Sequence, residues 1–109
     1  MSFVDRYAVA APDRAEVDAL PGAVVVEVGT DGCGHCQAAR PWVEAAFAAH
    51  GEVRHIKVED GRGRRLGRTF GVKLWPTLVF LRDGIEVARV VRPVDGDALS
   101  RAFKFVAAG

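Results

Sequence analysis

The chain has 109 residues, and half of them are hydrophobic, which is enough to bury the core of one domain without disulfide staples. Its 15 basic and 14 acidic residues leave a formal net charge of +1, so no overall field favours nucleic acid or an anionic membrane as a partner. No run approaches the ~20 apolar residues of a membrane span, and the first residues lack the pattern of a secretory signal. We therefore expect a single domain over residues 1–109, monomeric and cytoplasmic.

The spacing of apolar residues predicts elements in the order β, α, β, α, β, α, β, β, α. The first helix is expected to carry Pro12 in its first turn, and Asp95 is expected to cap the last helix. The predicted strands cover residues 6–9, 23–28, 53–58, 77–81 and 86–91, and the predicted helices cover residues 12–20, 34–50, 64–70 and 95–106.

Three of these segments carry the clearest signals. Residues 23–28 are almost entirely β-branched, which predicts a central strand buried on both faces. Residues 34–50 have apolar side chains at helical spacing and include Pro41, which should kink the helix. Asp83 and Gly84 predict a tight hairpin between the last two strands. The fold class is therefore α/β, with a mixed central sheet of four or five strands flanked by helices on both faces.

The most informative motif is Cys33-Gly34-His35-Cys36, which holds both cysteines of the chain just ahead of the longest predicted helix. Unpaired backbone N–H groups and the helix dipole stabilise a thiolate at such a helix start. We predict that Cys33 is the nucleophile and that Cys36 is the buried thiol that resolves a mixed disulfide. The alternative is a pair of inert core cysteines. Too few further ligands lie nearby to complete a zinc site, so we expect no metal.

Three features in order resemble the thioredoxin family: the dithiol after a buried strand, Pro41 five residues past Cys36, and Trp75-Pro76-Thr77 before the hairpin. The resemblance covers roughly residues 6–107 and implies a thioredoxin-like fold. It also implies a redox-active disulfide between Cys33 and Cys36 and no bound organic cofactor. The implied partners are protein disulfide substrates and an electron donor, either a thioredoxin reductase or a small thiol. The tetrapeptide itself is the form found in protein disulfide isomerases.

The resemblance also assigns roles outside the tetrapeptide. Glu27 interrupts a buried strand, where a carboxylate is costly without a partner, and it matches the family's acid that moves protons to and from Cys36. Lys57 resembles the family's lysine that pairs with this acid. Pro76 matches the family's cis-proline, which faces the dithiol and lets the preceding backbone pair with an extended substrate. The alternative for Glu27 is a place on a solvated face of the sheet.

His35 occupies a position where thioredoxins proper usually carry proline. Its imidazolium and hydrogen-bonding capacity would stabilise the thiolate of Cys33, and a stabilised thiolate makes the disulfide a stronger oxidant. The alternative is that His35 is a tolerated polar residue on the surface.

The chain departs from the family pattern near the dithiol. Gly32 stands where the family has tryptophan, Gly29 replaces a usual aromatic residue, and Arg92 replaces a glycine of the substrate groove. Trp75 is larger than the family's usual residue, and it either contacts substrate or packs against its own loop. The residues expected to contact substrate are Gly34, Trp75, Pro76 and Arg92.

The sequence thus favours an enzyme, a thiol–disulfide oxidoreductase that reduces or exchanges protein disulfides. A disulfide oxidant or isomerase is an alternative that His35 favours and the missing secretory signal disfavours. A non-catalytic adaptor or chaperone-like module is a further alternative, because the docking positions are altered. The basic cluster at residues 62–68 lacks the stacking aromatic residues of a nucleic-acid site, so it predicts a solvated surface or a docking site for an acidic partner.

Overall fold

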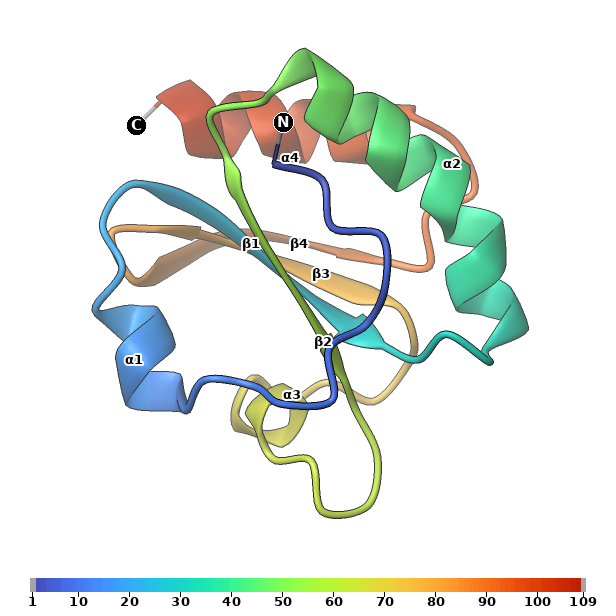
Figure 1. The fold of residues 1–109 in the computed structure, drawn as a ribbon. Helices are drawn as coiled ribbons and strands as arrows, with labels where there is room; N and C mark the ends of the chain where they lie inside the picture. Colours follow the sequence, from blue (N-terminus) through green and yellow to red (C-terminus); the bar gives the residue numbers. More distant parts are fainter. Residues whose placement is uncertain (1, 109) are drawn as a thin grey trace.

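The computed structural model describes residues 2–108 and contains one four-stranded sheet with helices packed on it (Figure 1). Within these residues no helix is both long enough and apolar enough to span a bilayer. The elements in chain order are α1 (Arg14–Asp18), β1 (Ala23–Gly29), α2 (Gly34–Ala49), β2 (Arg54–Glu59), α3 (Leu66–Thr69), β3 (Thr77–Arg82), β4 (Ile85–Val91) and α4 (Asp97–Ala108).

The sheet has the strand order β2-β1-β3-β4 and is mixed. β1 is parallel to β2 and antiparallel to β3, and β3 forms an antiparallel hairpin with β4. The turn of that hairpin has positive φ at Asp83 (50°) and at Gly84 (80°), as a two-residue hairpin turn requires. The central place predicted for β1 is confirmed.

The edge strand expected at residues 6–9 is wrong, because only Ala8 pairs with the sheet. Ala8 forms an isolated parallel bridge to Val58, donating to the carbonyl of Lys57 and accepting from the N–H of Glu59. The preceding residue leaves the ladder: the N–H of Tyr7 donates to Asp31 Oδ1 at 3.3 Å. The N-terminal segment therefore crosses the outer edge of β2 instead of extending along it (Figure 1).

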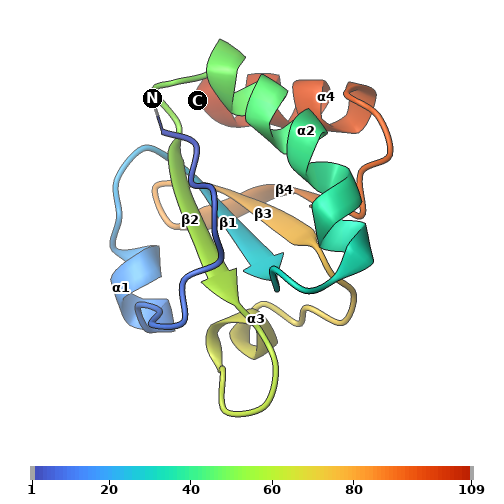
Figure 2. The ribbon, with the colours of Figure 1, turned by 45° about the vertical axis from the view of Figure 1, so that its right-hand side comes forward.

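Helices cover both faces of the sheet, with α2 and α4 on one side and α1 and α3 on the other (Figure 2). Side chains alternate along β1, so Val25 packs in the core under α2 and α4 while Val26 packs in the core over α1 and α3. The first core includes Phe47, Leu78 and Phe103, and the second includes Val17, Leu66 and Leu81. Glu27 shares the face of Val25 and therefore points toward α2.

Two helix starts differ from the sequence expectation. Asp13 caps α1 through a capping box, accepting from the N–H of Glu16 at 2.9 Å while the Glu16 side chain accepts from the Asp13 N–H. Pro12 therefore lies before the cap and not in the first turn. α4 begins at Asp97, two residues later than expected. Asp95 therefore lies before the helix, and its Oδ1 accepts from the N–H of Asp97 at 2.9 Å.

α2 begins at Gly34, directly after β1 and a short loop, and contains Pro41 as expected. The ribbon of α2 changes direction along its length (Figures 1 and 2), as is usual where a proline removes a helical hydrogen bond. Cys33 is the N-cap of this helix, and Cys36 lies in its first turn.

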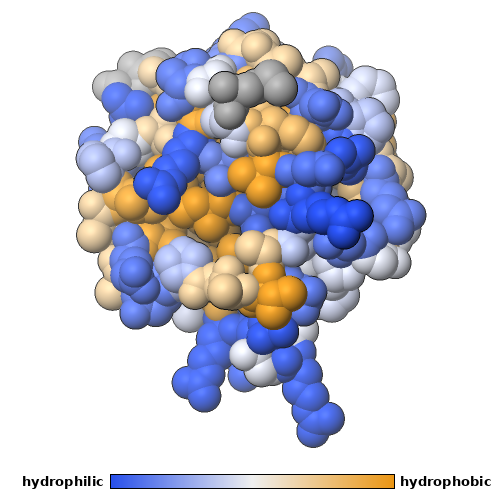
Figure 3. All heavy atoms as spheres, in the orientation of Figure 1, coloured by the Kyte–Doolittle hydropathy of each residue, from blue (hydrophilic) through white to orange (hydrophobic). Residues whose placement is uncertain are grey.

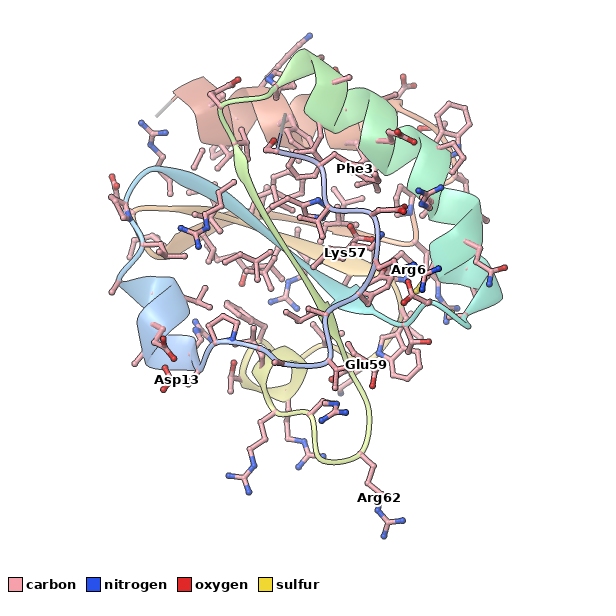
Figure 4. The ribbon with its side chains drawn as sticks, viewed as in Figure 1. Phe3, Arg6, Asp13, Lys57, Glu59 and Arg62 are labelled. Carbon is pink, nitrogen blue, oxygen red and sulfur yellow. The ribbon has the colours of Figure 1, made fainter. Side chains whose placement is uncertain are left out.

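The basic cluster lies at the bottom of the molecule, where hydrophilic side chains project from the loop before α3 (Figure 3). Arg62 points away from the rest of the chain (Figure 4). Arg65 and Arg68 are exposed as well, and Arg64 Nε pairs with Glu59 Oε1 at 3.4 Å. The side chains of the cluster are thus open to solvent, as both a solvated surface and a docking site for an acidic partner require.

Candidate active site

The two cysteines occupy different environments at the start of α2. Cys33 is the N-cap residue, with extended backbone (φ −85°, ψ 125°), and it is partly exposed. Cys36 lies in the first turn and is 4% exposed. Both thiols are free in this structure. One sulfur can therefore meet a partner from solvent while the other is covered by protein.

The protein shifts the two thiol pKa values in opposite directions. The backbone N–H of Cys36 lowers the pKa of the Cys33 thiol, and the Cys36 thiol, the backbone of His35 and the charge of Arg92 lower it further against the opposing effect of desolvation. Burial raises the pKa of the Cys36 thiol, although hydrogen bonds from the Thr30 backbone and the Tyr7 hydroxyl oppose that rise. Cys33 is thus the thiol prepared to be a nucleophile.

The contribution of His35 to this pKa comes through its backbone. Its side chain is exposed, and so is the neighbouring Gly34, where an added Cβ would meet no atom within 4 Å. The first turn of α2 therefore presents an open surface on the outer side of the dithiol.

Glu27 is buried in the sheet with both oxygens hydrogen-bonded, and it is 1% exposed. Its Oε2 accepts from the Tyr7 hydroxyl at 2.7 Å, and its Oε1 lies 2.8 Å from His55 Nε2. The other ring nitrogen, Nδ1, accepts from the N–H of Val4 at 2.9 Å, so the ring hydrogen lies on Nε2. The alternative of a solvated Glu27 is wrong.

The predicted pair of Lys57 with Glu27 is also wrong. The two residues are in register across β1 and β2, but Lys57 Nζ donates to the carbonyl of Asp5 at 2.8 Å and lies 4.5 Å from the centre of the Tyr7 ring. The N-terminal segment crosses over β2 at this point and offers Lys57 a closer acceptor (Figure 4). Glu27 has Tyr7 and His55 as its hydrogen-bond partners instead of Lys57.

Tyr7 and His55 were not identified from the sequence, and Gly29 was the one signal for Tyr7. A Cβ at position 29 would lie 2.5 Å from Cys36 Sγ and 2.8 Å from the Tyr7 hydroxyl oxygen. Glycine at the end of a strand marks a close approach by other groups, and here those groups are the Cys36 thiol and the Tyr7 hydroxyl. Tyr7 fills the space beside Gly29.

Arg92 links the Trp75-Pro76 loop to the dithiol, because it bonds the loop and its charge acts on Cys33. The Trp75–Pro76 peptide bond is cis. Arg92 Nε donates to the Trp75 carbonyl at 2.7 Å, and the charge of the same side chain lowers the pKa of Cys33. The indole Nε1 of Trp75 donates to Asp60 Oδ2 at 2.8 Å, so the ring is anchored to its own protein at that edge.

A comparison with models of protein families shows to which family this chain belongs. The family model described as Thioredoxin matches residues 12–104. The chain belongs to the thioredoxin family. Thioredoxins are disulfide oxidoreductases that use a redox-active disulfide and no external cofactor. Within residues 2–108 no group of three or more His, Cys, Asp or Glu side chains is placed to hold a metal ion.

Individual relatives agree with this assignment. The thioredoxin of Chlamydia muridarum is 36% identical over 78 residues, which cover 72% of this chain and 76% of that protein. Protein disulfide-isomerase A3 of Gallus gallus is 35% identical over 80 residues, which cover 72% of this chain and 16% of that protein. The structure of thioredoxin 2 from Pseudomonas aeruginosa PAO1 in its reduced form superimposes with a TM-score of 0.87 and 58% identity, covering 98% of this chain and 100% of that chain. The predicted thioredoxin-like fold is confirmed.

Proposed function

We propose that this thioredoxin-family protein reduces or exchanges disulfides of protein substrates, with Cys33 as the attacking thiol and Cys36 as the resolving thiol. The observation that carries the proposal is the asymmetry of the pair. Cys33 is accessible and its pKa is lowered, while Cys36 is buried and its pKa is raised. An enzyme that forms a mixed disulfide needs one thiolate ready to attack and a second thiol that acts afterwards.

The reaction balances over two exchanges. The Cys33 thiolate attacks one sulfur of the substrate disulfide, so a bond between Cys33 and that sulfur forms and the second substrate sulfur leaves as a thiolate. Cys36 then loses its proton and attacks Cys33 Sγ, which forms the Cys33–Cys36 disulfide and releases the first substrate sulfur. The substrate gains two electrons and the protein loses two, which a reductase or a low-molecular-weight thiol must restore.

The remaining residues have supporting roles in this proposal. Glu27 accepts the proton that Cys36 must lose, since it is a buried carboxylate and it bonds Tyr7, whose hydroxyl lies beside Cys36. The exposed first turn of α2 at Gly34 and His35, together with the loop at Trp75 and Pro76, forms the surface that receives the substrate chain.

Turnover of insulin disulfides with dithiothreitol tests the proposal. The wild-type protein is expected to accelerate reduction, and Cys33→Ser is expected to lower the rate to that of dithiothreitol alone. Cys36→Ser is expected to accumulate mixed disulfides that mass spectrometry detects. Wild-type turnover at the uncatalysed rate would overturn the proposal and favour a thioredoxin-fold adaptor.

A disulfide oxidant or isomerase is the second candidate, favoured by His35 within the tetrapeptide and by the similarity to protein disulfide-isomerases of vertebrates. A reductant suits a reducing compartment such as the cytoplasm, whereas an oxidant does not. Equilibrium with glutathione separates the two, because an oxidant keeps its reduced form at potentials where a thioredoxin is oxidised.

A further inference from the structure

We propose that Tyr7 is a catalytic residue that carries the proton between the Cys36 thiol and the Glu27 carboxylate. This inference rests on the proposed function, because it describes how the resolving thiol is activated. The Tyr7 hydroxyl donates to Glu27 Oε2 at 2.7 Å, and the same hydroxyl shares the space beside Gly29 with the Cys36 thiol. Tyr7 is 5% exposed, so the same hydroxyl joins a buried thiol to a buried carboxylate.

The position of this hydroxyl is fixed from several sides. The backbone of Gly29 admits both Cys36 Sγ and the Tyr7 oxygen, since a Cβ there would lie 2.5 Å and 2.8 Å from them. The Tyr7 N–H is held by Asp31 Oδ1, and Lys57 Nζ lies 4.5 Å from the ring centre. The ring therefore has little freedom to turn its hydroxyl away from Cys36 and Glu27.

At the far end of the chain of hydrogen bonds, two donors fix the orientation of the Glu27 carboxylate. His55 donates from Nε2 to Oε1, while Tyr7 donates to Oε2. Oε2 is therefore directed at the Tyr7 hydroxyl. His55 does not touch the reacting sulfur, so it is a positioning residue.

The proton transfer balances without a further reactant. As Cys36 attacks Cys33 Sγ, the Cys36 proton passes to the Tyr7 oxygen and the Tyr7 proton passes to Glu27 Oε2. The bond between Cys33 and the substrate sulfur breaks, and that sulfur leaves with the electron pair. Burial raises the pKa of Tyr7, so the hydroxyl hands a proton on without persisting as phenolate. Glu27 returns the proton by the same route when the disulfide is reduced.

The surroundings of Tyr7 and Cys36 indicate at which pH the proton transfer is needed. A pocket of about 360 Å³ borders Tyr7 and Cys36 on the side of the N-terminal segment, so hydroxide can reach the thiol directly at alkaline pH. The relay is therefore needed most near neutral pH. The charged and titratable groups around Tyr7 and the two thiols include Asp5, Arg6, Glu27, Asp31, His35, Arg40, His55, Lys57 and Arg92.

The test uses Tyr7→Phe, which keeps the ring and removes the hydroxyl. The reduced protein is mixed with dithiobis(nitrobenzoate), which releases one thionitrobenzoate when Cys33 attacks and a second when Cys36 resolves the mixed disulfide. The leaving group needs no proton, so the second phase reports deprotonation of Cys36. We expect an unchanged first phase and a second phase slower by about tenfold or more near neutral pH, with the difference closing at alkaline pH.

Thr69→Val is the matched control, because it removes a hydroxyl that bonds the Leu66 carbonyl in α3. Its two phases are expected to equal those of the wild type. An unchanged second phase in Tyr7→Phe overturns the relay while leaving the proposed function intact. A wild-type protein that releases a single thionitrobenzoate overturns the proposed function itself.

A second measurement needs no substitution that could impair folding. Tyr7 is the chain's single tyrosine, so biosynthetic 3-fluorotyrosine labels this position alone. The ¹⁹F resonance is expected to shift when the dithiol is oxidised, because the sulfur that contacts the hydroxyl changes from thiol to disulfide. A resonance that stays in place on oxidation contradicts the contact on which the relay depends.

Discussion

The guanidinium of Arg92 donates from Nε to the carbonyl oxygen of Trp75 at 2.7 Å, and this bond ties together two loops beside the dithiol. The Arg92 N–H donates to the Pro76 carbonyl at 2.9 Å, so the backbone reinforces the tie. Arg92 adopts a φ of 49°, in the region that favours glycine. The arrangement keeps a positive charge near Cys33 and occupies the Trp75 carbonyl, part of the backbone expected to pair with a substrate strand.

Replacing Arg92 with glycine is expected to make Cys33 less reactive near neutral pH. The charge of Arg92 lowers the pKa of Cys33, so its loss raises that pKa and reduces the thiolate fraction. Alkylation by iodoacetamide should slow by a factor of about 2 to 5, the size of one partly exposed charge interaction. The rates should converge at a pH above both pKa values.

Arg92→Lys is the matched control, because it keeps the charge and loses the planar fork that reaches Trp75. It is expected to alkylate close to the wild-type rate. Equal slowing in both variants would assign the effect to the hydrogen bond and not to the charge.

Replacing His35 with proline is expected to make the protein more reducing. Proline has no N–H, and the backbone of His35 helps to lower the pKa of Cys33. A less stable thiolate favours the disulfide, so the potential should fall toward that of a thioredoxin, by up to about 90 mV. Equilibration with glutathione gives the potential directly.

His35→Ala separates the backbone from the imidazole. It keeps the N–H, so most of the wild-type potential should remain. If alanine moves the potential as far as proline does, the imidazole and not the backbone sets it, as the sequence alone suggested.

The fold could be predicted from the sequence because its main signals are local. The β-branched run over residues 23–28 is long enough to indicate a central strand, and Asp83-Gly84 has the backbone freedom that a two-residue hairpin turn needs. The segment at residues 6–9 has no such local signal. Its composition is typical of a strand, but the Tyr7 N–H donates to the Asp31 side chain and not to β2.

The site was predictable only where residues lie on patterned elements. Glu27 stands out because it interrupts an apolar strand, and the two cysteines stand at a helix start. Tyr7 and His55 reach Glu27 from 20 and 28 residues away in the chain, and neither sits in a pattern that marks it. Lys57 was placed correctly by register, but the Asp5 carbonyl became its partner.

Trp75 is expected to report the redox state of the dithiol by fluorescence. The chain has two tryptophans, and Trp42 is 42% exposed on α2. In Trp42→Phe the remaining emission comes from Trp75, which lies in the loop that Arg92 ties to the site. Oxidation should change this emission. Trp75→Phe is the control, and oxidation should change its emission less than that of Trp42→Phe. A larger change in Trp75→Phe would contradict a position of Trp75 near the dithiol.

Adding a methyl group at Gly29 is expected to destabilise the reduced protein, because the new Cβ would lie 2.5 Å from Cys36 Sγ and 2.8 Å from the Tyr7 oxygen. Overpacking of this kind costs about 1–3 kcal/mol of unfolding free energy, which urea denaturation measures. Gly32→Ala is the matched control, since its nearest neighbour would be Thr30 Oγ1 at 3.8 Å, and its stability should stay near that of the wild type.

The double variant Gly29→Ala/Tyr7→Phe tests whether the two side chains share this space. Removing the Tyr7 hydroxyl gives the new methyl group room on one side, while the clash with Cys36 Sγ remains. The double variant should therefore lose less stability than the sum of the single variants, as neighbours that compete for one space do. Additive losses would mean that Tyr7 does not fill the space beside Gly29, and the hydroxyl would then lack the position from which it reaches Cys36.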